Sequence, residues 1–166
     1  MTTTSAQSIT VSHRVIHLRV AIDNFTRELE RLAGRLEPQA LREVSDAASV
    51  RALIDGMQGE QGLMIFGKLD HGLLPTLHGQ PQKAFRYYIG NPLVAFSMTR
   101  HDIRAALYAP LSVLVYQIDA QTTRVEFDLP STLFGQFGHP EVTRVGVQLD
   151  EKLTTLIEKA AQSAKA

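Results

Sequence analysis

The densest group of chemically capable side chains lies in the second half of the chain, at Met98-Thr99-Arg100-His101-Asp102. Arg100 presents a planar fork of donors that suits a carboxylate or a phosphate. His101 changes protonation near neutral pH, and Asp102 could hold its imidazole in one tautomer, as a general base requires. The same run has an equally good structural explanation, because Thr99 or Asp102 can cap a helical turn and leave the basic pair in solvent. The sequence leaves both interpretations open.

Asp70-His71 forms a second carboxylate–imidazole pair, directly after a predicted strand. The pair could transfer a proton if Asp70 oriented the ring of His71. Aspartate is also a turn residue whose side chain bonds the backbone that follows, and Gly72 eases such a bend. The turn interpretation is therefore favoured.

His13 and His17 have the spacing with which a helix binds zinc. The β-branched residues around them favour a strand instead. On a strand the two side chains would share a face but stand ~13 Å apart, which is too far to share one ion. We therefore predict no metal site here.

The stretch Pro130–His139 contains two aromatic residues, Phe134 and Phe137, among glycines. The aromatic rings could wall an apolar pocket, and the glycines would allow a close approach to a ligand. The rings could equally fill the gap between the sheet and the last helix. Core packing is favoured, because most phenylalanines are buried.

Composition and missing motifs argue against several classes of protein. Lysine plus arginine equals aspartate plus glutamate, at 17 each, whereas nucleic-acid binding usually leaves a basic excess. Cysteine is absent, which removes disulfides, thiolate zinc sites and cysteine nucleophiles. No GxSxG, GxGxxG or HExxH motif occurs, and we predict no cofactor. No apolar run approaches the ~20 residues of a membrane span and no signal-peptide pattern opens the chain, so we expect a cytoplasmic protein without a membrane partner.

Periodicity and capping residues predict the elements that must position these side chains. Strands are expected over Ile9–Ala21, Leu63–Leu69, Ala84–Ile89, Leu111–Ile118 and Arg124–Leu129. Helices are expected between Asp23 or Asn24 and Pro38, over Ser49–Met57 with Asp46 or Ser49 as the cap, and over about Pro140–Ala164. The crossover Asn91–Ala109 should be partly helical, because asparagine before proline is a good helix start. These elements predict an α+β fold with a mixed or antiparallel sheet of about five strands, covered by helices and ending in a long amphipathic helix.

Six segments carry a family resemblance in their order along the chain: IFGKLDHG, YYIGNP, MTRHD, LYAPLSVLVY, RVEFDLPS and FGQFG. On these segments, the chain from about Gly62 to Ala160 resembles the family called domain of unknown function 302, or DUF302. The resemblance implies an α+β domain, a sheet covered by helices and a homodimer, and it brings no activity or catalytic residue. We expect a single domain over 1–166, in which 9–60 form a strand plus two helices and 62–165 form the DUF302-like region.

The favoured hypothesis is a homodimeric module that binds a small anionic ligand where the crossover meets the sheet and the connection 131–139. The predicted ligand-binding residues are Asn91, Arg100, His101, Asp102, Tyr108, Tyr116 and Phe134. An enzyme that uses either of the two His–Asp pairs as a general base is one alternative. A structural or interaction protein without a pocket is another.

Overall fold

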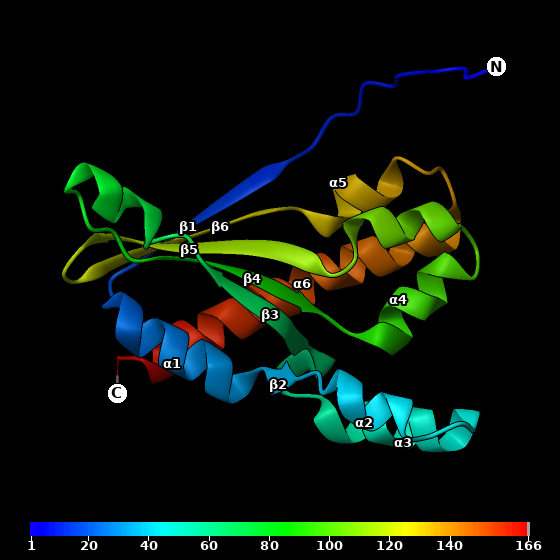
Figure 1. Cartoon of the computed structure of the whole chain (residues 1–166), viewed down its shortest axis with the longest axis horizontal. Coiled ribbons are helices and arrows are strands. Elements are labelled where there is room, and N and C mark those ends of the chain that lie inside the picture. The colour runs from blue at the N-terminus through cyan, green and yellow to red at the C-terminus, as the bar shows by residue number, and fades with distance from the viewer. Residues whose placement is uncertain (166) are drawn as a thin grey trace.

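The strands form one six-stranded sheet in the order β1-β6-β5-β4-β3-β2 (Figure 1). They are β1 (His13–Leu18), β2 (Gly34–Arg35), β3 (Met64–Asp70), β4 (Ala84–Gly90), β5 (Leu111–Asp119) and β6 (Thr122–Asp128). All neighbours run antiparallel except β2, which is parallel to β3. The computed structural model describes residues 1–165. The predicted α+β fold with a mixed sheet is confirmed, and the two-residue β2 is the strand that the sequence did not predict.

Six α-helices and three 3-10 turns complete the described part of the chain. The helices are α1 (Ile22–Leu32), α2 (Pro38–Arg42), α3 (Ala47–Met57), α4 (Pro92–Thr99), α5 (Pro130–Gly135) and α6 (Pro140–Ser163). The turns are η1 (Glu60–Gly62), η2 (Leu74–His78) and η3 (Ile103–Tyr108). The long C-terminal helix is thus confirmed to within one residue at its end.

The core lies between one face of the sheet and the helices α1 and α6, which pack against each other. Val113 and Val115 of β5 and Val125 of β6 point to this face, and all three are fully buried. Leu153 and Leu156 of α6 belong to the same cluster. Alternate residues of the same strands point to the opposite face, as expected for an antiparallel sheet that is covered on one side. We call the two sides the helix face and the open face.

Side-chain caps begin two helices as the sequence predicted. Asp46 accepts a hydrogen bond from the backbone N–H of Ser49 at 2.9 Å and caps α3. Asn91 accepts from the backbone N–H of Leu93 at 2.8 Å and caps α4, with Pro92 in the first turn. Each cap satisfies a backbone donor that the helix itself leaves unpaired.

The first strand is shorter than the predicted Ile9–Ala21. It pairs with β6 only from His13, opposite Asp128, to Leu18, opposite Thr123. The partner strand spans no more than Thr122–Asp128, so β-branched residues outside this window have no ladder to join. The strand propensity of these residues predicted that a strand forms here, whereas the length of the partner strand β6 determines where β1 begins and ends.

Other parts of the chain differ from the predicted elements or were not described by them. The helix that was expected to run up to Pro38 ends at Leu32, and Gly34 and Arg35 pair with β3 as β2. The helix α1 begins at Ile22, with Ala21 in the capping position, so neither Asp23 nor Asn24 caps it. Asp23 instead lies in the first turn, where a negative charge interacts favourably with the helix dipole. The stretch 130–139 is not wholly irregular, because α5 starts at Pro130. The connection 71–83 contains η2, which no periodicity indicated.

Candidate functional site

A groove of about 630 Å³ runs over the open face of the sheet. The residues that line it come from β1, β4, β5, β6 and the connection after β3: His13, His71, Gln82, Ala84, Arg86, Ser112, Leu114, Tyr116, Glu126, Phe127 and Asp128. Strand alternation explains why so many are polar, since their neighbours along each strand fill the core on the helix face. We call this the open-face groove.

His13 lies between two carboxylates at one side of the groove. Its Nδ1 is 2.8 Å from Asp128 Oδ1, and its Nε2 is 3.1 Å from Glu126 Oε2. The imidazolium form can donate to both, and the hydrogen bonds to Asp128 and then Glu126 raise the pKa of His13. Within residues 1–165, His13 is the only histidine with a ring nitrogen within 4.0 Å of a carboxylate oxygen.

Glu126 connects this histidine to a phenol and a guanidinium. The Tyr116 hydroxyl donates to Glu126 Oε1 at 2.6 Å, and Arg124 Nη1 donates to the Tyr116 oxygen at 3.1 Å. The bond from Tyr116, followed by the one from His13, lowers the pKa of Glu126, and the same carboxylate raises the pKa of Tyr116. The Nε of Arg124 is buried and has no hydrogen-bond partner among the residues that the structure describes.

Arg86 is the cation at the other side of the groove. Its Nε and Nη2 both donate to Ser112 Oγ, at 3.2 and 2.7 Å, and its guanidinium carbon is 5.0 Å from the centre of the Tyr88 ring. In the described part of the chain, no carboxylate oxygen lies within 4.0 Å of Arg86. The guanidinium is therefore held in place by neutral partners, and its charge is not neutralised.

The pairing register separates the two charged sides. Arg86 is opposite Leu114 on β5, and Leu114 is opposite Glu126 on β6. Two strand spacings place the backbone of Arg86 about 10 Å from that of Glu126. The groove thus offers an unneutralised guanidinium on one side and a hydrogen-bonded imidazole–carboxylate–phenol network on the other. This arrangement can bind an anionic group, supply further hydrogen bonds and move a proton at His13.

One of the seven ligand-binding residues predicted from the sequence, Tyr116, lies in this groove. Asn91 has structural partners, since it caps α4 and its side-chain N–H donates to the Gly62 carbonyl at 2.8 Å. Asp102 caps η3 and binds the Arg104 guanidinium, which lowers the pKa of its carboxyl. The carboxylate of Asp102 is therefore directed to Arg104.

Arg100 and His101 are exposed in the turn after α4. The ring of His101 lies 4.8 Å from that of His139, centre to centre. The crossover and the stretch 131–139 therefore do come together, although neither Arg100 nor His101 lines the open-face groove.

Tyr108 and Phe134 also lie where the crossover and the stretch 131–139 come together, on the inner side of these segments. The Tyr108 ring meets the buried Phe134 edge-on at 6.4 Å. A cavity of about 70 Å³ lies close by, with Asn91, Met98, Pro110 and Phe134 in its wall. Its volume is far below the ~300 Å³ at which small-molecule sites begin.

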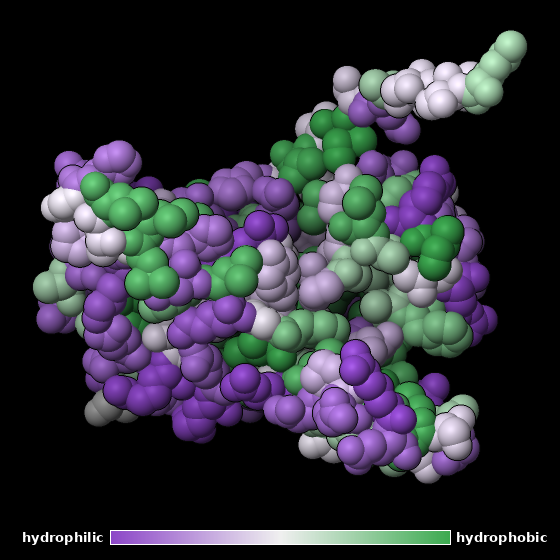
Figure 2. Space-filling model, in the orientation of Figure 1, coloured by the Kyte–Doolittle hydropathy of each residue, from purple (hydrophilic) through white to green (hydrophobic). Residues whose placement is uncertain are grey.

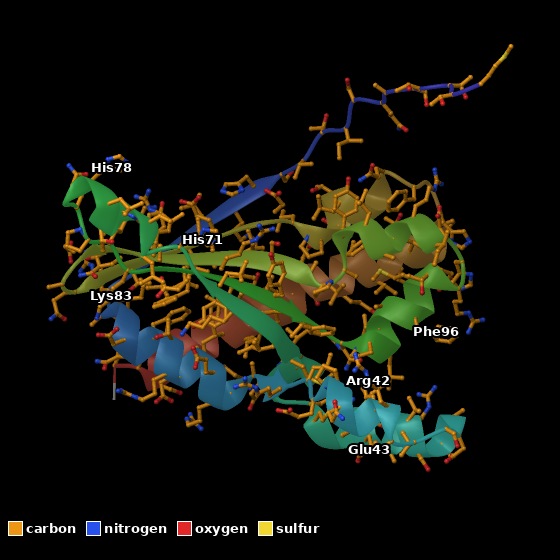
Figure 3. The ribbon with its side chains drawn as sticks, in the orientation of Figure 1. Arg42, Glu43, His71, His78, Lys83 and Phe96 are labelled. Atoms are coloured by element: carbon orange, nitrogen blue, oxygen red, sulfur yellow. The ribbon has the colours of Figure 1, made fainter. Side chains whose placement is uncertain are left out.

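Asp70 and His71 are not paired with each other in the way a general base requires. Asp70 Oδ1 accepts from the Gly72 N–H at 2.8 Å, which is the turn that the sequence favoured. His71 instead lines the open-face groove, near the base of the connection that follows β3 (Figure 3).

Sequence reasoning missed Arg86, His13 and Glu126 as members of one site. Signals did exist, because Arg124, Glu126 and Asp128 alternate along a predicted strand and therefore share one of its faces, and His13 was predicted to lie on another strand. The missing information was the strand order. Only the pairing of β1 with β6, and of β5 with β4, brings these side chains into one groove.

The six-stranded mixed sheet, covered by helices on one face and polar on the other, defines an α+β domain with an open sheet face. The model of the family described as Domain of unknown function DUF302 matches residues 41–160, and the chain belongs to this family. The match begins earlier than the resemblance from about Gly62 indicated.

A solved structure shares this fold. It is the uncharacterized conserved protein DUF302 from Bacillus stearothermophilus, with 13% sequence identity and a TM-score of 0.63 over 89% of this chain and 97% of that one. No curated protein sequence matches this chain. Among the described residues, no helix is both long and apolar enough to cross a membrane, and no group of three or more His, Cys, Asp or Glu could hold a metal ion.

Proposed function

We propose that this protein binds a small anionic ligand in the open-face groove, with Arg86 as the residue that takes the anionic group. One observation carries the proposal: Arg86 is oriented by Ser112 and Tyr88, lines a groove and lacks a carboxylate partner among the described residues. An arginine fork that is already held in place loses little side-chain freedom when a carboxylate or phosphate binds.

The network around Glu126 supports an anionic ligand despite its two carboxylates. His13 contacts both Asp128 and Glu126, and Tyr116 donates to Glu126. These bonds offset the negative charge on that side of the groove, so the repulsion of an incoming anion is reduced. Tyr116 and His13 are then placed to exchange hydrogen bonds with polar groups of the ligand that are distant from its anionic end.

The test compares variants of two arginines. Inorganic phosphate and acetate are the probes, and their binding is measured by NMR titration. Arg86→Gln should weaken binding about tenfold or more, the cost of one charged hydrogen-bonded partner. Arg100→Gln is the matched control and also the competing prediction, because the sequence placed the anionic group there. If Arg100→Gln abolishes binding and Arg86→Gln does not, the site belongs to the crossover and the proposal is wrong.

We further propose that the chain acts as a homodimer and that it is located in the cytoplasm. The absence of cysteine fits this location. Exposed apolar side chains on α4 and η3, two elements that pack against each other, support the proposed dimer. Phe96 of α4 and Ile103 and Leu107 of η3 are all largely exposed. Large exposed apolar patches mark interaction sites.

Analytical ultracentrifugation tests this pairing. Leu107→Glu should convert a dimer to a monomer without lowering the melting temperature of the subunit, because Leu107 is exposed. Val147→Glu, on the exposed side of α6, is the control and should leave the mass unchanged. A wild-type protein that sediments as a monomer at micromolar concentration would refute the dimer.

A further inference from the structure

The connection between β3 and β4, residues 71–83, exposes three leucines on one turn. We call this segment the flap; η2 forms its centre and His78 lies near its tip (Figure 3). Leu73, Leu74 and Leu77 are 66%, 65% and 78% exposed. Hydrophobic atoms gather over the flap in the space-filling view (Figure 2). Single exposed leucines are ordinary, but three on one short turn indicate a surface that binds something apolar.

Two of these leucines border a second groove, of about 820 Å³. Leu74, Leu77 and the half-exposed Ile118, near the end of β5, are the large apolar residues of its lining, which also contains His78 and three glutamines. Among the described residues, none that lines this groove is a lysine, arginine, aspartate or glutamate. We call it the flap groove.

The flap groove continues the open-face groove. Gln82 lines both, and His71 at the other end of the flap lines the open-face groove. Arg86 is opposite Leu114, and Ile118 lies four residues further along β5, or about 13 Å at strand spacing. A path therefore leads from an unneutralised guanidinium to the apolar side chains of Leu74, Leu77 and Ile118 over the length of a short alkyl chain.

We propose that the ligand of this protein is a single-chain amphiphile, whose anionic head binds Arg86 and whose apolar chain lies in the flap groove against Leu74, Leu77 and Ile118. This inference rests on the proposed function, because it needs the head at Arg86, and it adds the class of ligand. Charge complementarity at one end and uncharged walls at the other select the amphiphile over a small polar anion.

The composition of the flap argues against a bilayer as the occupant. Peripheral membrane binding combines apolar side chains with lysine and arginine that contact anionic lipids. Residues 71–82 read HGLLPTLHGQPQ and contain neither. The adjacent Lys83 is engaged by Asp23 of α1. The flap thus supplies apolar contact without the basic residues of a membrane surface, which fits a monomeric ligand.

A chain-length series tests the inference. Ethyl, butyl, hexyl and octyl phosphate are titrated into the full-length protein below their micelle concentrations and followed by calorimetry. Each added methylene that enters the flap groove should tighten binding about threefold to fourfold, the effect of burying one CH₂. Arg86→Gln should weaken the whole series by a similar factor.

Flap variants locate the alkyl chain. Leu77→Ser and Leu74→Ser should flatten the dependence on chain length and leave ethyl phosphate binding unchanged. Leu73→Ser is the matched control, because Leu73 is as exposed as Leu74 but does not line the flap groove. All three residues are exposed, so the variants should fold, and an unchanged melting temperature verifies this.

The outcomes separate this inference from the proposed function. Binding of ethyl phosphate that depends on Arg86 without any gain on lengthening the chain would overturn the amphiphile and leave the anion site intact. A gain that the flap variants do not reduce would also overturn it. Binding to vesicles of anionic lipid without binding of monomeric octyl phosphate would replace the ligand with a membrane surface. Failure of every phosphate to bind the wild-type protein would refute both proposals.

Discussion

Tyr87 and Tyr88 are neighbours on β4, yet they lie on opposite faces of the sheet. Tyr87 points to the helix face, is fully buried and donates its hydroxyl hydrogen to Glu30 of α1 at 2.6 Å. Tyr88 points to the open face, is partly buried and stacks beneath the guanidinium of Arg86. Packing on the helix face therefore provides most of the stability of the domain. The open face can therefore carry charged and aromatic groups that contribute little to stability.

The two faces also hold the same pair of functional groups in different settings. Tyr116 on the open face donates to Glu126 at 2.6 Å, the same distance as between Tyr87 and Glu30. Burial, then the bond to Glu30, raises the pKa of Tyr87, whereas the bond to Glu126 is the first cause of the raised pKa of Tyr116. The same hydrogen bond should thus be worth more at Tyr87, which is fully buried, than at Tyr116, which is only partly buried.

The largest difference in stability between the two faces is expected when the ring of Tyr87 or the ring of Tyr88 is removed in separate variants. Tyr87→Ala should lower the free energy of unfolding by about 3–5 kcal/mol, the usual cost of deleting a buried aromatic side chain. Tyr88→Ala should cost less than about 1 kcal/mol, since it removes only a partly exposed cross-strand contact. Urea denaturation of both variants measures the difference. Equal losses would mean that the open face is part of the stabilising core.

A smaller contrast is expected from removing only the hydroxyl groups. Tyr87→Phe should cost about 1–2 kcal/mol, because the hydroxyl group of a fully buried tyrosine loses its hydrogen bond to a carboxylate while Lys68 remains bound to Glu30. Tyr116→Phe should cost about 0.5 kcal/mol, since Tyr116 is only partly buried and water can reach its hydroxyl group more easily than that of the fully buried Tyr87. Denaturation curves of the two variants, with unchanged slopes, give the comparison. A larger loss for Tyr116→Phe would reverse the assignment of the faces.

The smallest effect is expected from the protonation of His13 on the open face. The pKa of His13 is raised above its ordinary value of 6.5, so its stabilising contribution is complete below that value and is lost as pH rises through the folded pKa. The pKa of Glu126 is lowered from 4.5, so its contribution is lost only as pH falls below that range. The stability difference between wild type and His13→Gln should therefore be greatest near pH 5–6 and decline toward pH 8.5.

NMR titration of the His13 ring measures the same effect directly. The midpoint should lie above 6.5 in the wild type and move down in Asp128→Asn, which removes the first cause of the shift. His17 lies on the same face of the same strand, and within residues 1–165 no carboxylate oxygen lies within 4.0 Å of its ring nitrogens. A wild-type midpoint at or below 6.5 would contradict the geometry of the network.

Local patterns in the sequence predicted the fold more completely than the site. Alternation in β5 and β6, the Asn91 cap and the apolar stripe of α6 each depend on neighbours within a few residues, and the structure confirms these elements. The open-face groove depends instead on which strands adjoin. A cluster such as Met98–Asp102 attracts attention because its polar residues are adjacent in sequence, whereas β1 and β6 join residues that no local pattern relates.

The pairing of β1 with β6 also has a kinetic consequence. His13 and Asp128 are separated by 115 positions, so the bonds from His13 to Asp128 and Glu126 can form only when β1 has paired with β6. Closing so long a loop is entropically costly and tends to come late in folding. A ligand that needs this network would bind the finished domain in preference to partly folded forms, and it would act as a selective stabiliser of chains whose assembly is complete.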